Sequence, residues 1–211
     1  MFGRSSARDI AAAYPEAGPA LAEAIVEVAG RMGVPDPGWL ANLMNFETGG
    51  SFSPSIVNRT SGATGLIQFI PSTAAGMGTS TSALAAMSQL EQMRWVEAYL
   101  ENKVPAGGFT NPTDLYMAVF YPVAIGNPDY QFPSHVVAAN NGISTPREYA
   151  AKANARAKLP TGMRGTEILG TGVRVLPWLL GGSAALLLFA LYIRVREPKW
   201  AQFGAKRLES K

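Results

Sequence analysis

The residue best suited to acid–base chemistry is Glu47, which follows the mainly apolar run 43–46 at the end of a predicted helix. Burial against apolar side chains disfavours an ionised carboxyl group, and the negative end of the helix dipole repels its charge. Both effects raise the pKa toward the neutral range in which a general acid works. Glu47 is therefore the candidate catalytic residue. The alternative is a solvated glutamate in the last turn of a helix.

The segment 48–74 after Glu47 has the composition of a loop that approaches a ligand closely. Its many Gly, Ser and Thr residues permit tight turns and close backbone approach. Asn58 and Gln68 can each donate and accept hydrogen bonds, as the hydroxyl and N-acetyl groups of a sugar require. Phe69 offers an apolar wall. The alternative is an ordinary polar surface loop.

Three short motifs in this region resemble those of a known enzyme family. They are Glu47-Thr48, then Gly62-Ala63-Thr64-Gly65-Leu66-Ile67-Gln68, then Pro71-Ser72-Thr73-Ala74. Their order resembles that of the lytic transglycosylases of the soluble, goose-type lysozyme-like family and of the phage virion enzymes related to them. The resemblance is close from residue 47 to residue 74 and loose over the rest of 20–158.

The resemblance implies roles for individual residues. Glu47 matches the family's acid/base, and Tyr121 stands near the Tyr of the family's third motif, Ala-Tyr-Asn, where Pro122 replaces the Asn. Thr48 and Ile67 stand where Ser and Met are commoner. Together with the chemistry of the loop, this gives the expected substrate-binding residues: Thr48, Asn58, Ser61, Gly65, Leu66, Ile67, Gln68, Phe69 and Tyr121.

The distribution of carboxylates favours a reaction with one acidic residue. Most glycosidases need two carboxylates about 5–9.5 Å apart, yet no Asp or Glu lies between Glu47 and Glu91. In the related enzymes the substrate supplies the missing group: its acetamido oxygen assists departure, and its 6-hydroxyl closes a 1,6-anhydro ring. If a second carboxylate takes part, Asp114 and Asp129 are the first candidates.

Composition excludes several other chemistries. The 211-residue chain has no Cys, which rules out a disulfide scaffold, a thiolate metal site and a Cys nucleophile. Its single His, His135, is expected to be a loop or core side chain. We therefore expect no metal site and no cofactor.

The net charge of +3 does not indicate nucleic-acid binding once it is located along the chain. Residues 1–159 hold ten Lys/Arg and twelve Asp/Glu, whereas residues 160–211 hold eight and three. Phosphate neutralisation needs clustered cations on the binding face. Because the excess of basic residues lies in the C-terminal tail, no nucleic-acid partner is expected for the main domain.

Periodicity and helix signals predict a mainly α-helical, lysozyme-like domain. Apolar residues recur at the 3.6-residue period, and Asp-Pro and Asn-Pro pairs are typical of helix starts. Thr145 and Glu148 have the spacing of a capping box, and no segment alternates as a strand does. The expected helices cover about residues 20–32, 37–48, 71–75, 83–102 and 112–121, with another beginning after Thr145.

The C-terminal part is typical of a tether followed by a membrane span. The run 175–193 contains no charged residue, is long enough for a helix to cross a bilayer, and has Trp178 and Tyr192 near its ends. A buried core helix is the alternative. The expected organisation is 1–19 an N-terminal segment, 20–158 the lysozyme-like domain, 159–174 a Gly/Pro linker, 175–194 the transmembrane helix and 195–211 a basic tail.

These features together predict a membrane-anchored, single-pass lytic transglycosylase. Lys/Arg counts place the tail on the positive-inside side of the membrane and the main domain on the opposite side. The N-terminus, however, lacks the apolar region of a secretory signal that would export this domain. A membrane within a virus particle reconciles these two observations. Such an enzyme would open the cell wall locally as a viral genome enters the cell. Its expected partners are peptidoglycan strands, the lipid membrane and other virion proteins. The alternatives are a non-catalytic structural or vertex protein of a virion, and a cellular membrane-anchored murein hydrolase.

Overall fold

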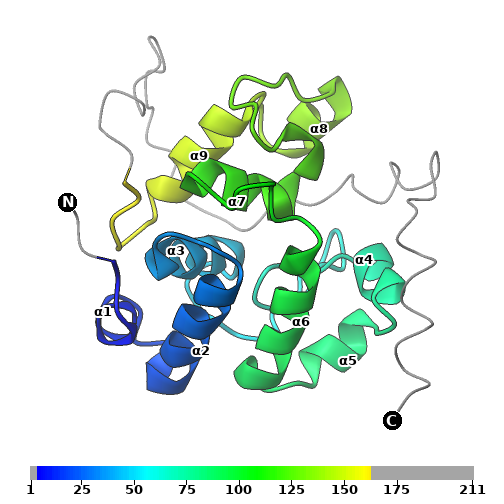
Figure 1. The fold of residues 1–211 in the computed structure, drawn as a ribbon. Helices are drawn as coiled ribbons and strands as arrows, with labels where there is room; N and C mark the ends of the chain where they lie inside the picture. Colours follow the sequence, from blue (N-terminus) through cyan, green and yellow to red (C-terminus); the bar gives the residue numbers. More distant parts are fainter. Residues whose placement is uncertain (1–3, 163–211) are drawn as a thin grey trace.

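The computed structural model describes residues 4–162, which form a mainly helical unit (Figure 1). These residues contain no β-strand, and the isolated bridges Val57–Thr64 and Thr64–Phe69 only link turns of one loop. The predicted mainly α class is confirmed. The helices are α1 (Ala7–Ala13), α2 (Gly18–Arg31), α3 (Pro37–Glu47), α4 (Pro71–Gly76), α5 (Thr81–Ala85), α6 (Gln89–Glu101), α7 (Pro112–Phe120), a 3-10 turn (Pro122–Ala124), α8 (Ser134–Ala139) and α9 (Pro146–Asn154).

Most helix ends follow local capping signals. Asp36 and Asn111 each accept a hydrogen bond from a backbone amide in the first turn of α3 and α7, as their Asp-Pro and Asn-Pro pairs predict. The single helix expected over 83–102 is wrong, because Ser88 and Glu91 form a capping box that begins α6 separately from α5. The continuous helical pattern of this segment therefore conceals a break.

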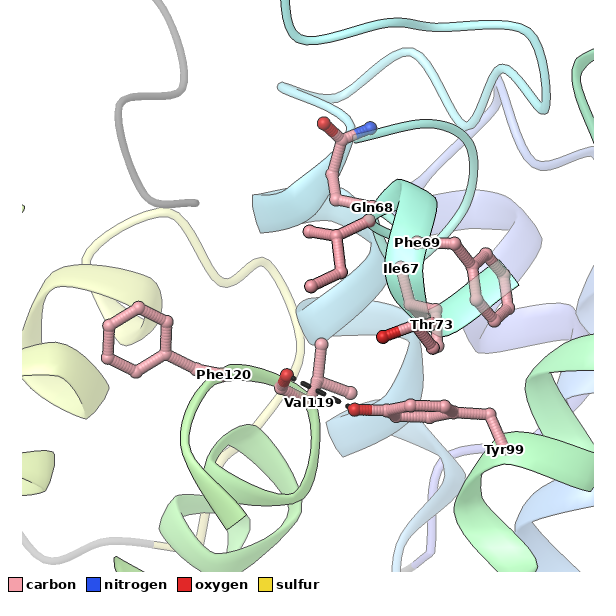
Figure 2. A pocket seen from close by; sticks show the side chains of 8 residues that line it. Ile67, Gln68, Phe69, Thr73, Tyr99, Val119 and Phe120 are labelled. Atoms are coloured by element: carbon pink, nitrogen blue, oxygen red, sulfur yellow. Dashed lines mark hydrogen bonds between the residues drawn. The ribbon is translucent and has the colours of Figure 1, made fainter. Parts of the chain in front are cut away.

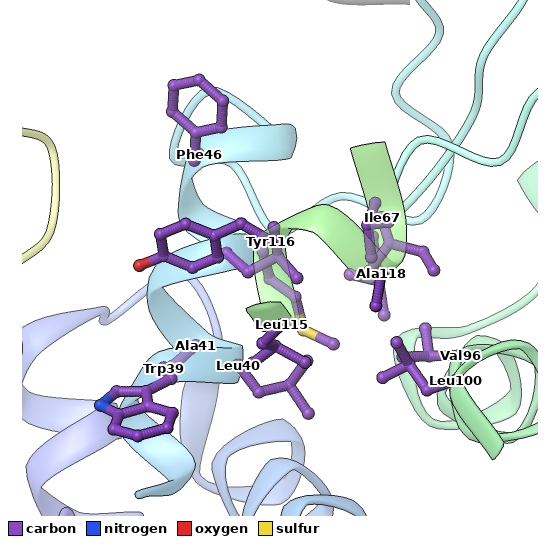
Figure 3. Close-up of a cluster of buried hydrophobic side chains, with 14 of the residues drawn as sticks. Trp39, Leu40, Ala41, Phe46, Ile67, Val96, Leu100, Leu115, Tyr116 and Ala118 are labelled. Atoms are coloured by element: carbon purple, nitrogen blue, oxygen red, sulfur yellow. The ribbon is translucent and has the colours of Figure 1, made fainter. Parts of the chain in front are cut away.

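Helix α3 is the centre of the fold. All eleven of its residues are buried, because α2, α7 and α9 all pack against it. Figure 3 shows Leu40 of α3 beside Leu115 of α7, within a cluster that also contains Val96 and Leu100 of α6. A helix enclosed in this way must find internal partners for its polar side chains.

Both ends of the described chain meet at one of these polar side chains, Asn42. Its Oδ1 accepts hydrogen bonds from the Tyr14 hydroxyl and from the Leu159 amide at 3.3 Å, and its Nδ2 donates to the Leu159 carbonyl at 3.1 Å. The Lys158 amide donates to the Tyr14 hydroxyl at 2.8 Å. Because α1 packs on α2 and Leu159 docks on α3, the helical unit extends beyond the expected limits of 20–158 at both ends.

The remaining C-terminal predictions lie outside the described residues. These are the rest of the linker, the transmembrane helix 175–194 and the tail 195–211. Within 4–162, no helix has both the length and the apolar character needed to cross a bilayer.

A fully buried amide, Gln92 on α6, joins α5 to two points of the loop between α3 and α4. Its Oε1 accepts from the Leu66 amide at 2.6 Å, and its Nε2 donates to the carbonyls of Pro54 at 3.0 Å and Leu84 at 2.9 Å. Gly65 has a φ of +85° and lies so close that a Cβ there would be 2.2 Å from Gln92 Oε1. Positive φ and close approach both require glycine at this position of the motif.

Replacing Gln92 by Leu is expected to lower the free energy of unfolding by about 3 kcal/mol or more, because three internal backbone groups lose their partner. Gln89→Leu is the matched control on the same helix. Its Nε2 also donates to a loop carbonyl, that of Phe52 at 2.9 Å, but the side chain is only partly buried, so water can replace it. Its loss should stay below about 1 kcal/mol. Denaturant unfolding followed by circular dichroism measures both, and equal losses would contradict the role of Gln92.

Candidate active site

Glu47 is the last residue of α3, and only 5% of its surface remains exposed. Its Oε1 accepts a hydrogen bond of 2.8 Å from the Tyr149 hydroxyl. Burial raises the pKa of the Glu47 carboxyl to about 7, against the opposing effect of the Tyr149 hydrogen bond. The predicted direction of the shift and its desolvation cause are confirmed. At neutral pH the protonated and ionised forms of Glu47 are similarly populated, as a group that must both give and take a proton requires.

Tyr149 on α9 fixes the orientation of this carboxyl group. Its ring stacks on Phe120 with centroids 4.3 Å apart and meets the Phe46 ring edge-on at 5.4 Å. The residue is 1% exposed, so neither its ring nor its hydroxyl has space to turn away. Tyr149 could not be identified from the sequence, because a Tyr on the apolar face of an amphipathic helix has no feature that separates it from a core residue.

A second tyrosine, Tyr99 on α6, lies within the electrostatic influence of Glu47. Burial and the Glu47 charge both raise the pKa of the Tyr99 phenol, burial being the larger cause. Its hydroxyl donates to the carbonyls of Ala118 at 3.2 Å and Val119 at 3.5 Å at the end of α7. The Phe69 ring packs edge-on against it at 5.9 Å. Tyr99 thus joins α6, α7 and the loop after Glu47.

Phe69, Tyr99 and Phe120 line a small, mostly apolar pocket that opens to solvent. In Figure 2, Val119 lies between two groups of side chains: Thr73 and Tyr99 are on one side of it, and Phe120 is on the other. The Gln68 side chain points away from Tyr99. Glu47 does not line the pocket. Of the lining residues, Phe120 stacks on Tyr149, which bonds to Glu47, and Tyr99 is near enough for the Glu47 charge to raise its pKa. The lining residues are Ile67, Gln68, Phe69, Ile70, Thr73, Tyr99, Val119 and Phe120.

Three predicted substrate-binding residues hold the shape of the loop before the pocket. Gln68 has the left-handed φ of +54° and donates from Nε2 to the Gly65 carbonyl at 3.1 Å. Asn58 Oδ1 accepts from the amides of Thr60 at 3.0 Å and Ser61 at 3.2 Å. Ser61 Oγ in turn accepts from the next turn of the loop. Of these residues, the pocket is lined by Gln68 alone.

Three other predicted contacts lie away from the pocket. The Thr48 hydroxyl donates to the Met44 carbonyl at 2.7 Å and accepts from the Phe52 amide at 3.0 Å, so it fastens the end of α3. Leu66 is completely buried, and Tyr121 packs in an aromatic cluster with Phe120, Tyr130 and Phe132. Of the expected substrate-binding residues, the structure brings Ile67, Gln68 and Phe69 to the pocket.

The two candidates for a second carboxylate are engaged elsewhere. Asp114 accepts from the Gly126 amide and from the Asn111 side chain, each at 2.8 Å. Asp129 pairs with Arg147 at 3.1 Å on the surface. Among the described residues, no other carboxylate contributes to the pKa shift of Glu47, and no cluster of three or more His, Cys, Asp or Glu could hold a metal ion.

Comparison of the chain with models of protein families, with curated proteins and with solved structures found no match. The chemistry of the site is therefore the basis for assigning a function.

Replacing Glu47 by Gln is expected to stabilise the protein in a pH-dependent way. The pKa of Glu47 rises from 4.5 to about 7 on burial, so the wild-type fold is favoured by proton binding below pH 4.5 and loses this stabilisation as the pH rises through 7. The amide of the variant does not titrate. The free energy of unfolding of Glu47→Gln, minus that of wild type, should therefore be about 3 kcal/mol larger at pH 8 than at pH 4. Denaturant unfolding at both pH values measures it, and a difference that does not change with pH would refute the buried, protonated carboxyl.

Proposed function

We propose that this protein is a peptidoglycan lytic transglycosylase that cleaves the β-1,4 bond between N-acetylmuramic acid and N-acetylglucosamine. The observation that carries the proposal is Glu47: a buried carboxyl with a pKa of about 7, held by Tyr149, whose ring stacks on Phe120 in the wall of a pocket. The motifs of residues 47–74 support the same chemistry, and so does the finding that no second carboxylate of residues 4–162 acts on Glu47.

In the proposed reaction, Glu47 acts twice. The protonated carboxyl first gives its proton to the oxygen of the leaving N-acetylglucosamine as the bond to the muramyl C1 breaks. The carboxylate then accepts the proton of the muramyl 6-hydroxyl as that oxygen bonds to C1. The products are a free 4-hydroxyl and a 1,6-anhydro-muramyl end, and Glu47 is protonated again. The Tyr149 hydrogen bond keeps one carboxyl oxygen oriented through both steps.

The proposed setting is a virus particle that opens the cell wall locally as its genome enters. Residues 175–194 would anchor the enzyme in the lipid membrane of the virion, with residues 4–162 acting on glycan strands in the periplasm and cell wall. Other virion proteins are the remaining proposed partners. The basis for this setting is the charge-free run 175–193, together with the resemblance of the motifs in 47–74 to those of phage virion enzymes.

The proposal predicts that Glu47→Gln lowers the rate of peptidoglycan cleavage by about 10²–10⁴-fold, because the amide cannot donate the proton. The side chains are nearly isosteric, so the fold should be retained. Glu101→Gln, at the exposed end of α6, is the control and should keep full activity. Release of soluble fragments from purified peptidoglycan measures both variants. Cleavage by Glu47→Gln at the wild-type rate would exclude Glu47 as the acid.

The products distinguish transglycosylation from hydrolysis. Ring closure by the 6-hydroxyl excludes water, so the muropeptides should end in 1,6-anhydro-muramyl groups, about 18 Da lighter than hydrolysed ends. Mass spectrometry of the digest measures this difference. Reducing ends in place of anhydro ends would show that water is the nucleophile and that a second carboxylate takes part.

A further inference from the structure

Three cations follow one another where the chain leaves α9. They are Lys152, Arg156 and Lys158, here called the cationic rim, and no acidic residue lies between 149 and 162. The ion pairs of the described residues involve Arg31 and Arg147 and none of the three. Residues 1–159 carry more acidic than basic residues, so the rim is a local feature of an otherwise slightly acidic domain.

The rim is held against the folded domain. The Arg156 guanidinium lies over the Phe46 ring at 5.7 Å, and its backbone carbonyl accepts a 2.9 Å hydrogen bond from Asn45 Nδ2. The Lys158 ammonium lies 5.3 Å from the Tyr14 ring. The backbone after α9 is therefore held against α3 and against Tyr14, at the end of α1. The side chains of Arg156 and Lys158 thus extend from a backbone of fixed position.

Within the rim, two like charges lie close together. Lys152 lies in the last turn of α9, and Arg156 lies in the turn just after its last residue, Asn154. Burial and then the charge of Arg156 lower the pKa of Lys152. Two like charges repel each other, and a bound anion would offset that repulsion.

The rim is also close to the candidate acid. Asn45 and Phe46, which contact Arg156, are the two residues that precede Glu47 on α3. The Phe46 ring meets Tyr149, and Tyr149 donates to Glu47. If the reacting bond of a ligand lies at Glu47, a long substituent of that ligand can reach the rim.

We propose that the cationic rim binds carboxylates of the stem peptide carried by the muramyl residue at Glu47, an inference that rests on the proposed function. The peptide extends from the muramyl lactyl group, and each of its residues spans up to about 3.4 Å. Three residues therefore reach about 10 Å, and Arg156 is linked to Glu47 through the rings of Phe46 and Tyr149. Arg156 offers the paired N–H groups that suit a carboxylate, and Lys152 adds a second cation beside it. Peptide-bearing glycan is then the preferred substrate class.

The test compares two forms of one substrate with the full-length protein. One is a soluble peptide-bearing glycan fragment, and the other is the same fragment with its carboxylates converted to amides. For wild type, KM should be roughly tenfold lower for the acidic form, and kcat the same for both. The Lys152→Gln/Arg156→Gln double variant should raise KM for the acidic fragment to that of the amidated one, with no effect on the amidated fragment. Reversal of charge, Lys152→Glu/Arg156→Glu, should make the amidated fragment the better substrate.

Arg94→Gln, an exposed cation on α6, is the matched control and should leave both KM values unchanged. Equal KM values for the two fragments with wild type would overturn the proposal, as would a double variant that behaves like wild type. Equal loss on both fragments would also overturn it, because it would assign the rim a structural role. Failure of wild type to cleave either fragment would instead contradict the proposed function. Binding of the two fragments to Glu47→Gln then still measures the preference of the rim without turnover.

Discussion

The enclosure of α3 is the constraint on which the rest of the structure depends. A helix surrounded by protein cannot leave its polar side chains to water, so each must be met by a group from another segment. Asn42 is met by Tyr14 and by the backbone at Leu159, and Glu47 by Tyr149. These partners come from the first helix, the last helix and the chain beyond it. The polar residues of α3 thus explain why distant parts of the chain close around it, and the same enclosure removes water from Glu47 and raises its pKa.

Features of the fold with a local cause could be predicted from the sequence. Helix starts at Asp36 and Asn111 depend on a side chain and the amides just after it, and both were found. The break before α6 was missed because Ala85, Ala86 and Met87 continue the helical pattern. Glu47 could be identified because it follows a mainly apolar run at the end of a predicted helix. Tyr149, which lies 102 residues later in the chain, could not, because only the packing of α9 on α3 brings its hydroxyl to the carboxyl.

The motif around Gly65 predicts a loop conformation better than it predicts ligand contacts. Gly65 is required by its positive φ and by the amide of Gln92, and Gln68 bonds back to the Gly65 carbonyl. Three of the eight residues that line the pocket, Tyr99, Val119 and Phe120, come from helices that the motif does not include. A short motif identifies residues that must keep a backbone in place. The opposite wall of a pocket depends on tertiary packing that no local pattern encodes.

The junction at Asn42 has a mechanical consequence. Asn42 lies five residues before Glu47, about 7 Å along the helix axis, and it bonds both carbonyl and amide of Leu159. A pulling force applied to the chain beyond Leu159 therefore acts first on the middle of α3 and on Tyr14. It reaches α9, and with it Tyr149, only after these hydrogen bonds and the one from Asn45 Nδ2 to the Arg156 carbonyl have broken. Hydrogen bonds to α3 and Tyr14 thus stand between such a force and the contact that orients the carboxyl of Glu47.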